Sequence, residues 1–430
     1  MKIAVYTLGC KVNTYESEYV IKEFLKRGYE LTSFDDDTAD IYLINTCTVT
    51  NTSDQKSRKM IRQAKAKNKW CIVAAMGCFT QIRNNDNAIY DYVDVVIGNK
   101  DKSKIVDLIE DYIKNRNKIL KIEQIDDATF DDMEISYFNT RTRALVKIED
   151  GCENFCSYCI IPYVRGKVRS KKKEKVIEEV TRLVNNGYKE VVLTGIHTGH
   201  YGSDLKDYDF SDLLNELQNI NGLERIRISS VEITELNDKF LDTLKKCDKI
   251  ANHIHIPLQA GSNHILKLMN RKYDKDYYIN KINEIRSIRP DIAITTDVIV
   301  GFPKESIDDF NETIDFVKKV NFAGGHVFPF SPRSGTVASK MTGILTKAEK
   351  HNRCKMLINV FDNLEEEYYK KHIKKEVKVI PENYLDGTLK GHTDNYLLVS
   401  FKCCEALIGK SVNVKITDYK DKVLIGKIKE

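Results

Sequence analysis

The sequence has no apolar stretch near the roughly 20 residues that a membrane-spanning helix requires. Its first apolar run, which starts at Met1, has the length of a strand, and it lacks both the long apolar segment and the small-residue cleavage site of a signal peptide. We therefore expect no membrane anchor and a cytoplasmic location.

The sequence also has no large excess of charge of one sign. The 68 Lys and Arg residues nearly balance the 63 Asp and Glu residues, and the net charge is +5. This balance permits a nucleic-acid partner without requiring one. With 430 residues the chain exceeds the size at which one hydrophobic core stops growing, and there is no internal repeat, so two or three domains are expected.

Three successive patterns of apolar residues along the chain predict an α/β protein of three domains. In residues 1–128, short apolar runs alternate with amphipathic stretches, which indicates β-α units and a parallel sheet. Residues 138–368 repeat this rhythm and predict a partial (β/α) barrel. Residues 369–430 contain β-branched runs with Gly turns, which predict a small antiparallel barrel. The six strands expected in the middle domain are 144–148, 190–194, 225–229, 253–257, 292–299 and 325–330.

The eleven cysteines are read as metal ligands before disulfides, because a cytoplasmic protein meets reducing conditions. Cys152, Cys156 and Cys159 are separated by three and then two residues, directly after a predicted strand. Three thiolates in one loop can bind three corners of an iron–sulfur cube and leave the fourth iron open. There are two alternatives: a zinc site with a fourth ligand from elsewhere, and a chance cluster of core cysteines. The polar residues Glu153 and Asn154 disfavour the chance cluster.

A second set, Cys10, Cys47 and Cys78, follows three predicted strands of the first domain. The carboxyl ends of parallel strands share one edge of a sheet, so these three side chains could converge there. The alternative is that each is an ordinary buried cysteine. The remaining cysteines are interpreted as core or surface residues: Cys71, Cys247, Cys354, Cys403 and Cys404.

The first set, with Tyr158 just before its last cysteine, resembles the signature of the radical S-adenosylmethionine superfamily. That resemblance implies a 4Fe-4S cluster whose open iron is chelated by S-adenosylmethionine, which is then split to a 5′-deoxyadenosyl radical. With Gly9-Cys10-Lys11, Asn45-Thr46-Cys47 and Gly77-Cys78, the whole chain is similar to the methylthiotransferase family. The similarity implies a TRAM domain at the C-terminus and a second 4Fe-4S cluster, held by Cys10, Cys47 and Cys78, that presents the sulfur to be transferred.

The stretch from Gly9 to Ser17 resembles the branch that methylthiolates carbon 2 of N(6)-threonylcarbamoyladenosine, next to the anticodon of tRNA. Other branches act on isopentenyladenosine or on a ribosomal-protein aspartate. A rival from another class is a non-catalytic iron–sulfur protein that binds RNA as a redox-sensitive regulator. The enzyme reading further implies an electron donor, either a reductase or a ferredoxin or flavodoxin.

Several segments after the predicted barrel strands also match the family. The resemblance makes the following residues candidates to contact S-adenosylmethionine: Tyr158, Thr194, Gly195, Glu232, Gln259, Asp297 and Gly301. Three positions depart from the family pattern. Ala260 stands where the family often has Ser, Lys304 where it usually has Gly, and Ile233 where it often has Pro. Histidines near apolar strands are more often hydrogen-bonded core residues than ligands. None is assigned to a metal among His253, His255, His264 and His326.

A basic run beside the cysteine loop, residues 163–173, could contact RNA phosphates. Arg165, Lys167 and Arg169 are the candidates within it, whereas the three lysines that end the run could equally be a solvated helix start. In the C-terminal domain, residues 391–396 resemble the TRAM pattern, which makes Asn395 and Tyr396 candidates for RNA contacts; small barrels of this kind often present basic and aromatic groups to RNA.

Overall fold

The computed structural model describes residues 1–36, 38–82, 87–138 and 142–429. The chain forms two compact units. Unit 1 comprises Met1–Ile135, Lys147–Lys171 and Ser331–Ser339, and unit 2 comprises Ser136–Val146, Lys172–Phe330 and Lys340–Glu430. The predicted middle domain begins beside residues 139–141, which lie outside the described residues, and its boundaries stay a prediction.

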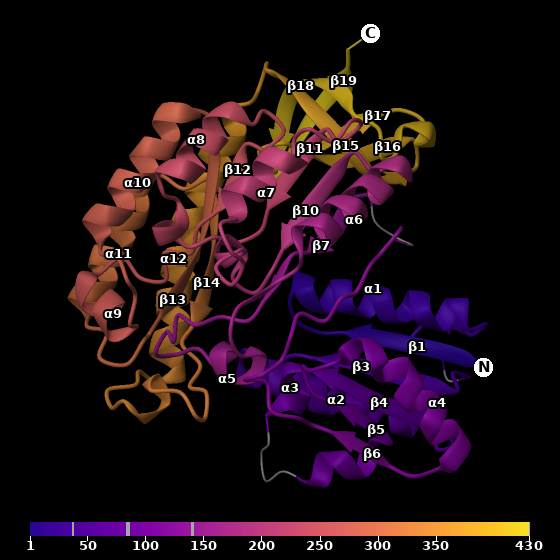
Figure 1. Ribbon diagram of the computed structural model, residues 1–430. Coiled ribbons are helices and arrows are strands. Elements are labelled where there is room, and N and C mark those ends of the chain that lie inside the picture. The colour runs from indigo at the N-terminus through magenta and orange to yellow at the C-terminus, as the bar shows by residue number, and fades with distance from the viewer. Residues whose placement is uncertain (37, 83–86, 139–141, 430) are drawn as a thin grey trace. The chain divides into compact units, whose positions relative to one another are not determined.

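Unit 1 contains a six-stranded parallel sheet in the order β2-β1-β3-β4-β5-β6, as the alternating pattern predicted (Figure 1). Its strands are β1 (Lys2–Thr7), β2 (Glu30–Thr32), β3 (Ile41–Thr46), β4 (Ile72–Gly77), β5 (Val95–Ile97) and β6 (Ile119–Lys121). Helices α1 (Lys11–Lys26) and α4 (Ile105–Asn115) pack on one face, and α2 (Asn51–Lys67) packs on the other. The central strands β3 and β4 are therefore buried along their whole length, as continuous apolar runs require.

Three short pieces complete the part of unit 1 that carries the cysteines. Helix α3 (Cys78–Gln81) follows β4, and α5 (Ile161–Arg165) follows the three-cysteine loop. Strand β8 (Glu149–Asp150) pairs antiparallel with β9 (Arg169–Ser170), so the loop and α5 form one excursion between two paired strands. This pairing closes the base of the loop.

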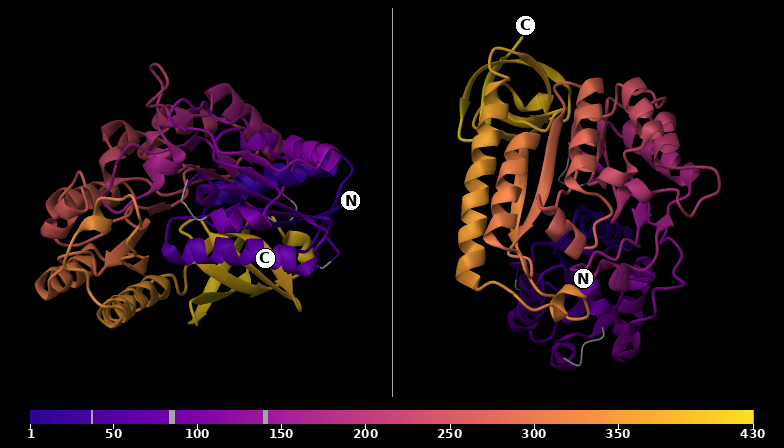
Figure 2. Two further views of the ribbon diagram at one scale, coloured as in Figure 1. Left: turned by 90° about the horizontal axis from the view of Figure 1, so that it is seen from below. Right: turned by 90° about the vertical axis from the view of Figure 1, so that its left-hand side faces the viewer.

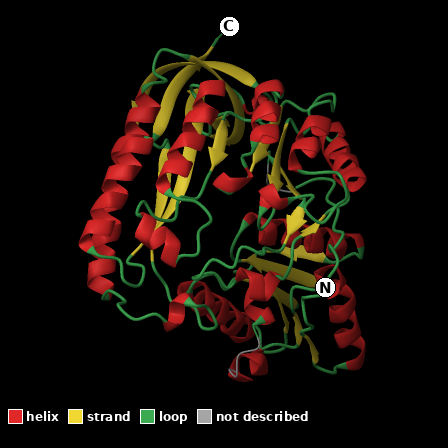
Figure 3. Cartoon of the chain, turned by 60° about the vertical axis from the view of Figure 1, so that its left-hand side comes forward, coloured by secondary structure: helices red, strands yellow, loops and turns green. Residues whose placement is uncertain are grey.

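Unit 2 contains two three-stranded sheets, in the orders β11-β10-β7 and β12-β13-β14 (Figure 3). The strands are β7 (Ala144–Lys147), β10 (Glu190–Thr194), β11 (Arg225–Ile228), β12 (His253–His255), β13 (Ala293–Val300) and β14 (Gly324–Pro329). The helices between them include α6 (Lys173–Asn185), α7 (Phe210–Leu217), α8 (Asp238–Lys246), α9 (Asn263–Leu268), α10 (Lys275–Ile288) and α11 (Ile307–Val320). The six predicted strands are confirmed, with boundaries that differ by at most two residues.

The long helix α12 (Lys347–Lys370) leads into a closed five-stranded barrel in the order β15-β16-β17-β19-β18 (Figure 2). Its strands are β15 (Glu376–Leu385), β16 (Thr388–Thr393), β17 (Leu398–Lys402), β18 (Val412–Lys420) and β19 (Val423–Ile428). All neighbouring strands are antiparallel except β17 and β19. Among the described residues, no helix has the length and hydrophobicity to cross a membrane.

Candidate active site

The second cysteine set gathers at the carboxyl edge of the unit 1 sheet, where the strand-end pattern placed it. Cys10 precedes α1, Cys47 follows β3, and Cys78 begins α3 directly after β4. A Cβ atom on Gly9 would lie 3.1 Å from the Cys47 Sγ, so the first two loops touch. Burial raises the pKa of the Cys10 and Cys47 thiols, and a charge on Cys78 raises both further. The Cys78 sulfur therefore lies within electrostatic reach of both other thiols.

Glycine is required at the position before Cys78. Gly77 has φ +106°, and a Cβ there would lie 2.6 Å from the backbone oxygen of Thr46. A side chain would both strain the backbone and clash with the neighbouring strand end. The glycine thus allows β4 to turn sharply into α3 with Cys78 at the turn.

A buried network of charges lies beside these cysteines. Arg165, which is 0% exposed, forms ion pairs with Glu16 at 2.9 Å and with Asp150 at 3.1 Å. Its Nε donates to the Cys78 Sγ over 3.2 Å. The Arg165 Nη2 donates to the Asn13 Oδ1, and this oxygen lies 3.8 Å from the Cys10 Sγ. Arg165 therefore connects two members of the cysteine set.

Cations outnumber carboxylates in this network. Besides Arg165, the residues paired with Glu16 or Asp150 are Lys102, Lys147 and Arg169. Burial, followed by repulsion from Arg165, lowers the pKa of Lys102 to about 8. An anionic group at the neighbouring cysteines would offset the excess positive charge, since buried charges need partners. The donor set and the charge both fit an iron–sulfur cluster held by three thiolates.

The first cysteine set occupies a tightly turned loop of unit 1. The Cys159 backbone N–H donates to the Cys156 carbonyl at 2.9 Å, and the Cys152 N–H donates to the Gly166 carbonyl at 3.0 Å. Phe155 has a positive φ of 46°, which reverses the chain between the first two cysteines. Burial raises the pKa of the Cys152 thiol, and charges on Cys159 and Cys156 add to this effect. Cys152 thus lies within electrostatic reach of the other two thiols, and three thiols on one tight loop fit an iron–sulfur cluster of their own.

The structure brings both cysteine sets into one compact unit, which the sequence analysis did not foresee. Cys78 packs against Ile160 and Val164, which immediately follow the first set. The segment 331–339 also touches both loops. The Ala338 N–H donates to the Ser157 carbonyl at 2.7 Å, and Arg333 donates to Thr48 Oγ1, next to Cys47, at 2.6 Å. Arg333 has no signal in the sequence that would link it to a cysteine so distant along the chain.

The candidates for S-adenosylmethionine contacts in unit 2 lie at or after the carboxyl ends of β10 to β13, except Asp297, which lies within β13. The Gln259 N–H donates to the Asp297 carbonyl, and the Ile299 N–H donates to the Gln259 carbonyl, both at 2.8 Å. Thr194 ends β10 and is buried, and Gly195 follows it. Gly301 ends the same stretch as Asp297, and the Glu305 carboxylate accepts a hydrogen bond from its N–H at 3.0 Å.

Two polar candidates in this region have defined partners. Glu232 forms an ion pair with Arg271, and burial raises the pKa of the Glu232 carboxyl against the attraction of Arg271. The Asp297 carboxylate lies between His255, at 3.4 Å, and His326, at 3.2 Å. Lys304, one of the departures from the family pattern, adopts φ +68°, a conformation that glycine reaches without strain.

The residues predicted to contact RNA are placed very differently from one another. Lys167 is exposed, whereas Arg165 and Arg169 are 0% and 7% exposed and take part in the buried ion network. Asn395 is also buried, and its amide donates to the Tyr368 hydroxyl and His372. Tyr396 is 39% exposed. The burial of Arg165, Arg169 and Asn395 gives their proposed RNA contacts no support, and these three residues instead stabilise the fold.

The fold and the three-cysteine loop define a class: a radical S-adenosylmethionine enzyme with an appended small barrel. Residues 146–317 match the radical SAM superfamily, residues 374–429 match the TRAM domain, and residues 2–98 match the uncharacterized protein family UPF0004. Among solved structures, the radical S-adenosylmethionine methyltransferase TsrM from Kitasatospora setae is similar in fold, with a TM-score of 0.59, 12% identity, and 79% of this chain and 77% of that chain covered. Membership of the superfamily implies S-adenosylmethionine and an iron–sulfur cluster.

Relatives that match over almost the whole chain show which family within the radical S-adenosylmethionine enzymes this chain belongs to. The chain is 44% identical to the threonylcarbamoyladenosine tRNA methylthiotransferase MtaB of Bacillus subtilis, over 96% of this chain and 93% of that protein. It is 40% identical to MtaB of Aquifex aeolicus, over 92% and 98%. It is 37% identical to the tRNA-2-methylthio-N(6)-dimethylallyladenosine synthase of a Thermoanaerobacter species, over 99% and 92%. The chain therefore belongs to the tRNA methylthiotransferase family, which confirms the resemblance seen in its cysteine motifs.

Proposed function

We propose that this protein replaces the hydrogen on carbon 2 of N(6)-threonylcarbamoyladenosine in tRNA with a methylthio group. The observation that carries the proposal is the pair of three-cysteine sets in one compact unit, in a chain 44% identical over almost its full length to a threonylcarbamoyladenosine tRNA methylthiotransferase. The protein works in the cytoplasm with a reductase, ferredoxin or flavodoxin as electron donor. The target base lies in an unpaired anticodon loop, where extrusion costs little.

The residues have distinct roles in this proposal. Cys152, Cys156 and Cys159 hold the cluster that, with S-adenosylmethionine, supplies one-electron cleavage to a 5′-deoxyadenosyl radical. Cys10, Cys47 and Cys78 hold a second cluster, and Arg165 stabilises the negative charge of that site through its hydrogen bond to Cys78. The S-adenosylmethionine contacts come from Tyr158, Thr194, Gly195, Glu232, Gln259, Asp297 and Gly301. The TRAM barrel, including Tyr396, and the exposed Lys167 bind the RNA.

Iron and sulfide analysis tests the number of clusters. The anaerobically reconstituted protein should hold about eight iron atoms per chain, and each triple cysteine-to-alanine variant about four. Retention of all the iron by either variant would contradict the assignment of that set. Alanine at Cys71 and Cys247 serves as a control, because both cysteines are buried outside the two sets.

Nucleoside mass spectrometry tests the reaction. The reconstituted protein is incubated anaerobically with reductant, S-adenosylmethionine and tRNA that lacks the methylthio group, and 2-methylthio-N(6)-threonylcarbamoyladenosine should appear. If 2-methylthio-isopentenyladenosine appears instead, the substrate branch is wrong. If 5′-deoxyadenosine forms without any modified nucleoside, the substrate is not this RNA. Cys156→Ser distinguishes an enzyme from a regulator, because an enzyme loses all turnover whereas a regulator can still bind RNA.

A further inference from the structure

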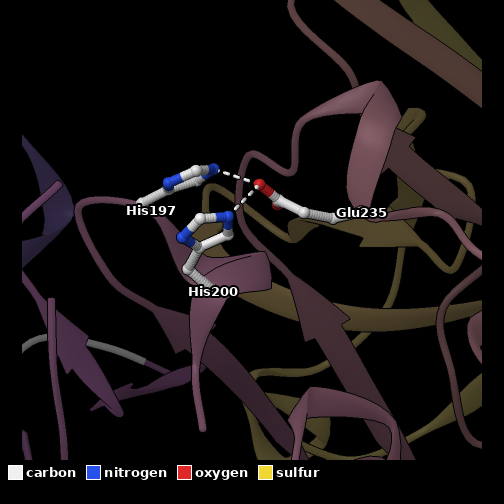
Figure 4. Close-up of side chains that lie close together, drawn as sticks. All are labelled: His197, His200 and Glu235. Atoms are coloured by element: carbon white, nitrogen blue, oxygen red, sulfur yellow. Dashed lines mark ion pairs between the residues drawn. The ribbon is translucent and has the colours of Figure 1, made fainter. Parts of the chain in front are cut away.

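Three side chains with metal-ligating atoms converge in unit 2, at positions that no cysteine motif or S-adenosylmethionine candidate includes. His197 follows β10, His200 ends the short helix η3 (Thr198–His200), and Glu235 ends the short helix η4 (Ile233–Glu235). One ligand atom from each lies within 4.8 Å of the other two. Figure 4 shows both imidazole rings directed at the same carboxylate. The two loops follow neighbouring strands, so the cluster joins the carboxyl ends of β10 and β11.

The imidazoles present the same nitrogen to the same oxygen. The His200 Nε2 lies 3.4 Å from the Glu235 Oε1, and the His197 Nε2 also contacts that oxygen. The rings are stacked, with centroids 4.0 Å apart and planes inclined by 21°. Two nitrogen donors and one carboxylate oxygen therefore occupy one small volume, with their coordinating atoms turned inward.

The backbone around Glu235 holds its carboxylate in this position. The Glu232 N–H donates to the Glu235 Oε2 at 3.2 Å, which leaves Oε1 directed at the histidines. A Cβ atom on Gly199 would lie only 1.9 Å from the same Oε2. Glycine between the two histidines is thus what allows the carboxylate to approach, so the turn is shaped around this group.

The three side chains lie at different depths, with two of them shielded from solvent and the third partly open to it. The side chains of His197 and Glu235 are 5% and 10% exposed, and that of His200 is 35% exposed.

We propose that His197, His200 and Glu235 form a site for a divalent cation of the zinc type. Two imidazoles and one carboxylate are a ligand set that zinc uses when it keeps a fourth position open. A bound ion would join the loop after β10, which carries Thr194 and Gly195, to the loop after β11, which carries Glu232. The proposal does not depend on the methylthio transfer, because it concerns only the residues of these two loops.

Zinc binding to the cluster-loaded protein tests the site. Reconstitution of both clusters first occupies the six cysteines, and the protein is then equilibrated with zinc and desalted. Mass spectrometry should detect about one zinc ion per chain. Absorption at the zinc K-edge, where iron does not interfere, should show nitrogen and oxygen ligands without sulfur. Sulfur ligands would place the metal on cysteine and overturn the proposal.

Two variants make the result specific. His200→Ala should lose the zinc, and its partial exposure makes it the substitution least disruptive to folding. His264→Ala is the matched control, because His264 also contacts a carboxylate, Asp309, at 3.1 Å, but has no third ligand in the described structure. Zinc should raise the melting temperature of the wild type and of His264→Ala but not of His200→Ala. Equal zinc content in wild type and His200→Ala would reduce the cluster to a histidine–carboxylate hydrogen-bond group.

Discussion

At the scale of single residues, Arg165 joins the buried ion network of unit 1 to the cysteine Cys78. Its Nε–H donates to the Cys78 Sγ over 3.2 Å, and a donor to a thiolate stabilises the more negative, reduced form of a cluster. We predict that Arg165→Lys lowers the reduction potential of the cluster held by Cys10, Cys47 and Cys78, because lysine keeps the charge but loses the Nε–H. A titration followed by electron paramagnetic resonance measures it.

This experiment requires a protein that holds one cluster only, and a control substitution away from that cluster. Alanine at all three cysteines of the first set isolates the second cluster, and Arg116→Lys changes an exposed arginine of the same unit. An unchanged potential in Arg165→Lys would contradict the role of the hydrogen bond. Arg165→Met should also destabilise the fold by about 1–3 kcal/mol, because the buried Asn13 Oδ1 loses its donor, although Glu16 and Asp150 keep their lysine and Arg169 partners.

The sequence analysis read Arg165 as a phosphate ligand because it lies in a basic run. Its ion pair with Glu16 joins residues 149 positions apart, and no local pattern reports such a contact. The cysteines, by contrast, follow strand ends, and the geometry of parallel sheets brings strand ends together whatever the side chains around them. Residue types at strand ends were therefore predictable, whereas their ionic partners depended on tertiary packing.

His326 gives unit 2 a small pH dependence. Its hydrogen bond to Asp297 raises the pKa of His326. A pKa raised by folding contributes stability below the unfolded value of about 6.5, and this contribution is lost as the pH rises through the folded pKa. We predict that His326→Gln lowers the melting temperature more near pH 6 than near pH 8.5. The effect should stay below about 1 kcal/mol, because the side chain is 72% exposed. An equal loss at both pH values would contradict it.

At the scale of elements, the three-cysteine loop depends on one glycine. A Cβ on Gly151, at φ +96°, would lie 1.9 Å from the Lys167 carbonyl oxygen. We predict that Gly151→Ala opens the base of the loop and loses the iron of the first cluster. Gly187 has the same φ of +96° but nothing within 4 Å of its Cβ position. Gly187→Ala should cost only about 1–2 kcal/mol and keep its iron. Equal iron loss in both variants would mean that strain, not the clash, is responsible.

Elements were predicted where burial is continuous. The strands of unit 2 that carry the candidate site are mostly buried, so apolar runs report them within two residues. The sequence predicted a barrel here but not the bounds of β15, in which half of the residues are exposed, Lys378 among them. Helix α12 ends at Lys370, where the chain turns into the barrel. Half-exposed strands in small barrels have too few apolar positions for periodicity to reveal them.

At the scale of the whole chain, a buried ion group attaches the barrel to the sheet of β7, β10 and β11. Glu190 is fully buried and accepts hydrogen bonds from Arg225 and Arg227, each at 2.8 Å. The same arginines donate to barrel carbonyls, at 3.3 Å to Lys378 and 3.0 Å to Thr393. Glu190 thus orients two cations that hold the barrel.

Replacing Glu190 should loosen this attachment. Glu190→Gln leaves both arginines without a countercharge, and we predict a loss of about 3–5 kcal/mol in unfolding free energy. Glu224→Gln is the matched control, because Glu224 also joins the sheet to the barrel, through Lys378 at 2.9 Å, but its side chain is 29% exposed. Its loss should stay within about 1 kcal/mol. Urea unfolding measures both, and limited proteolysis should release the barrel faster from Glu190→Gln alone. Equal effects would mean that the barrel is held by its apolar contacts and not by the buried ion group.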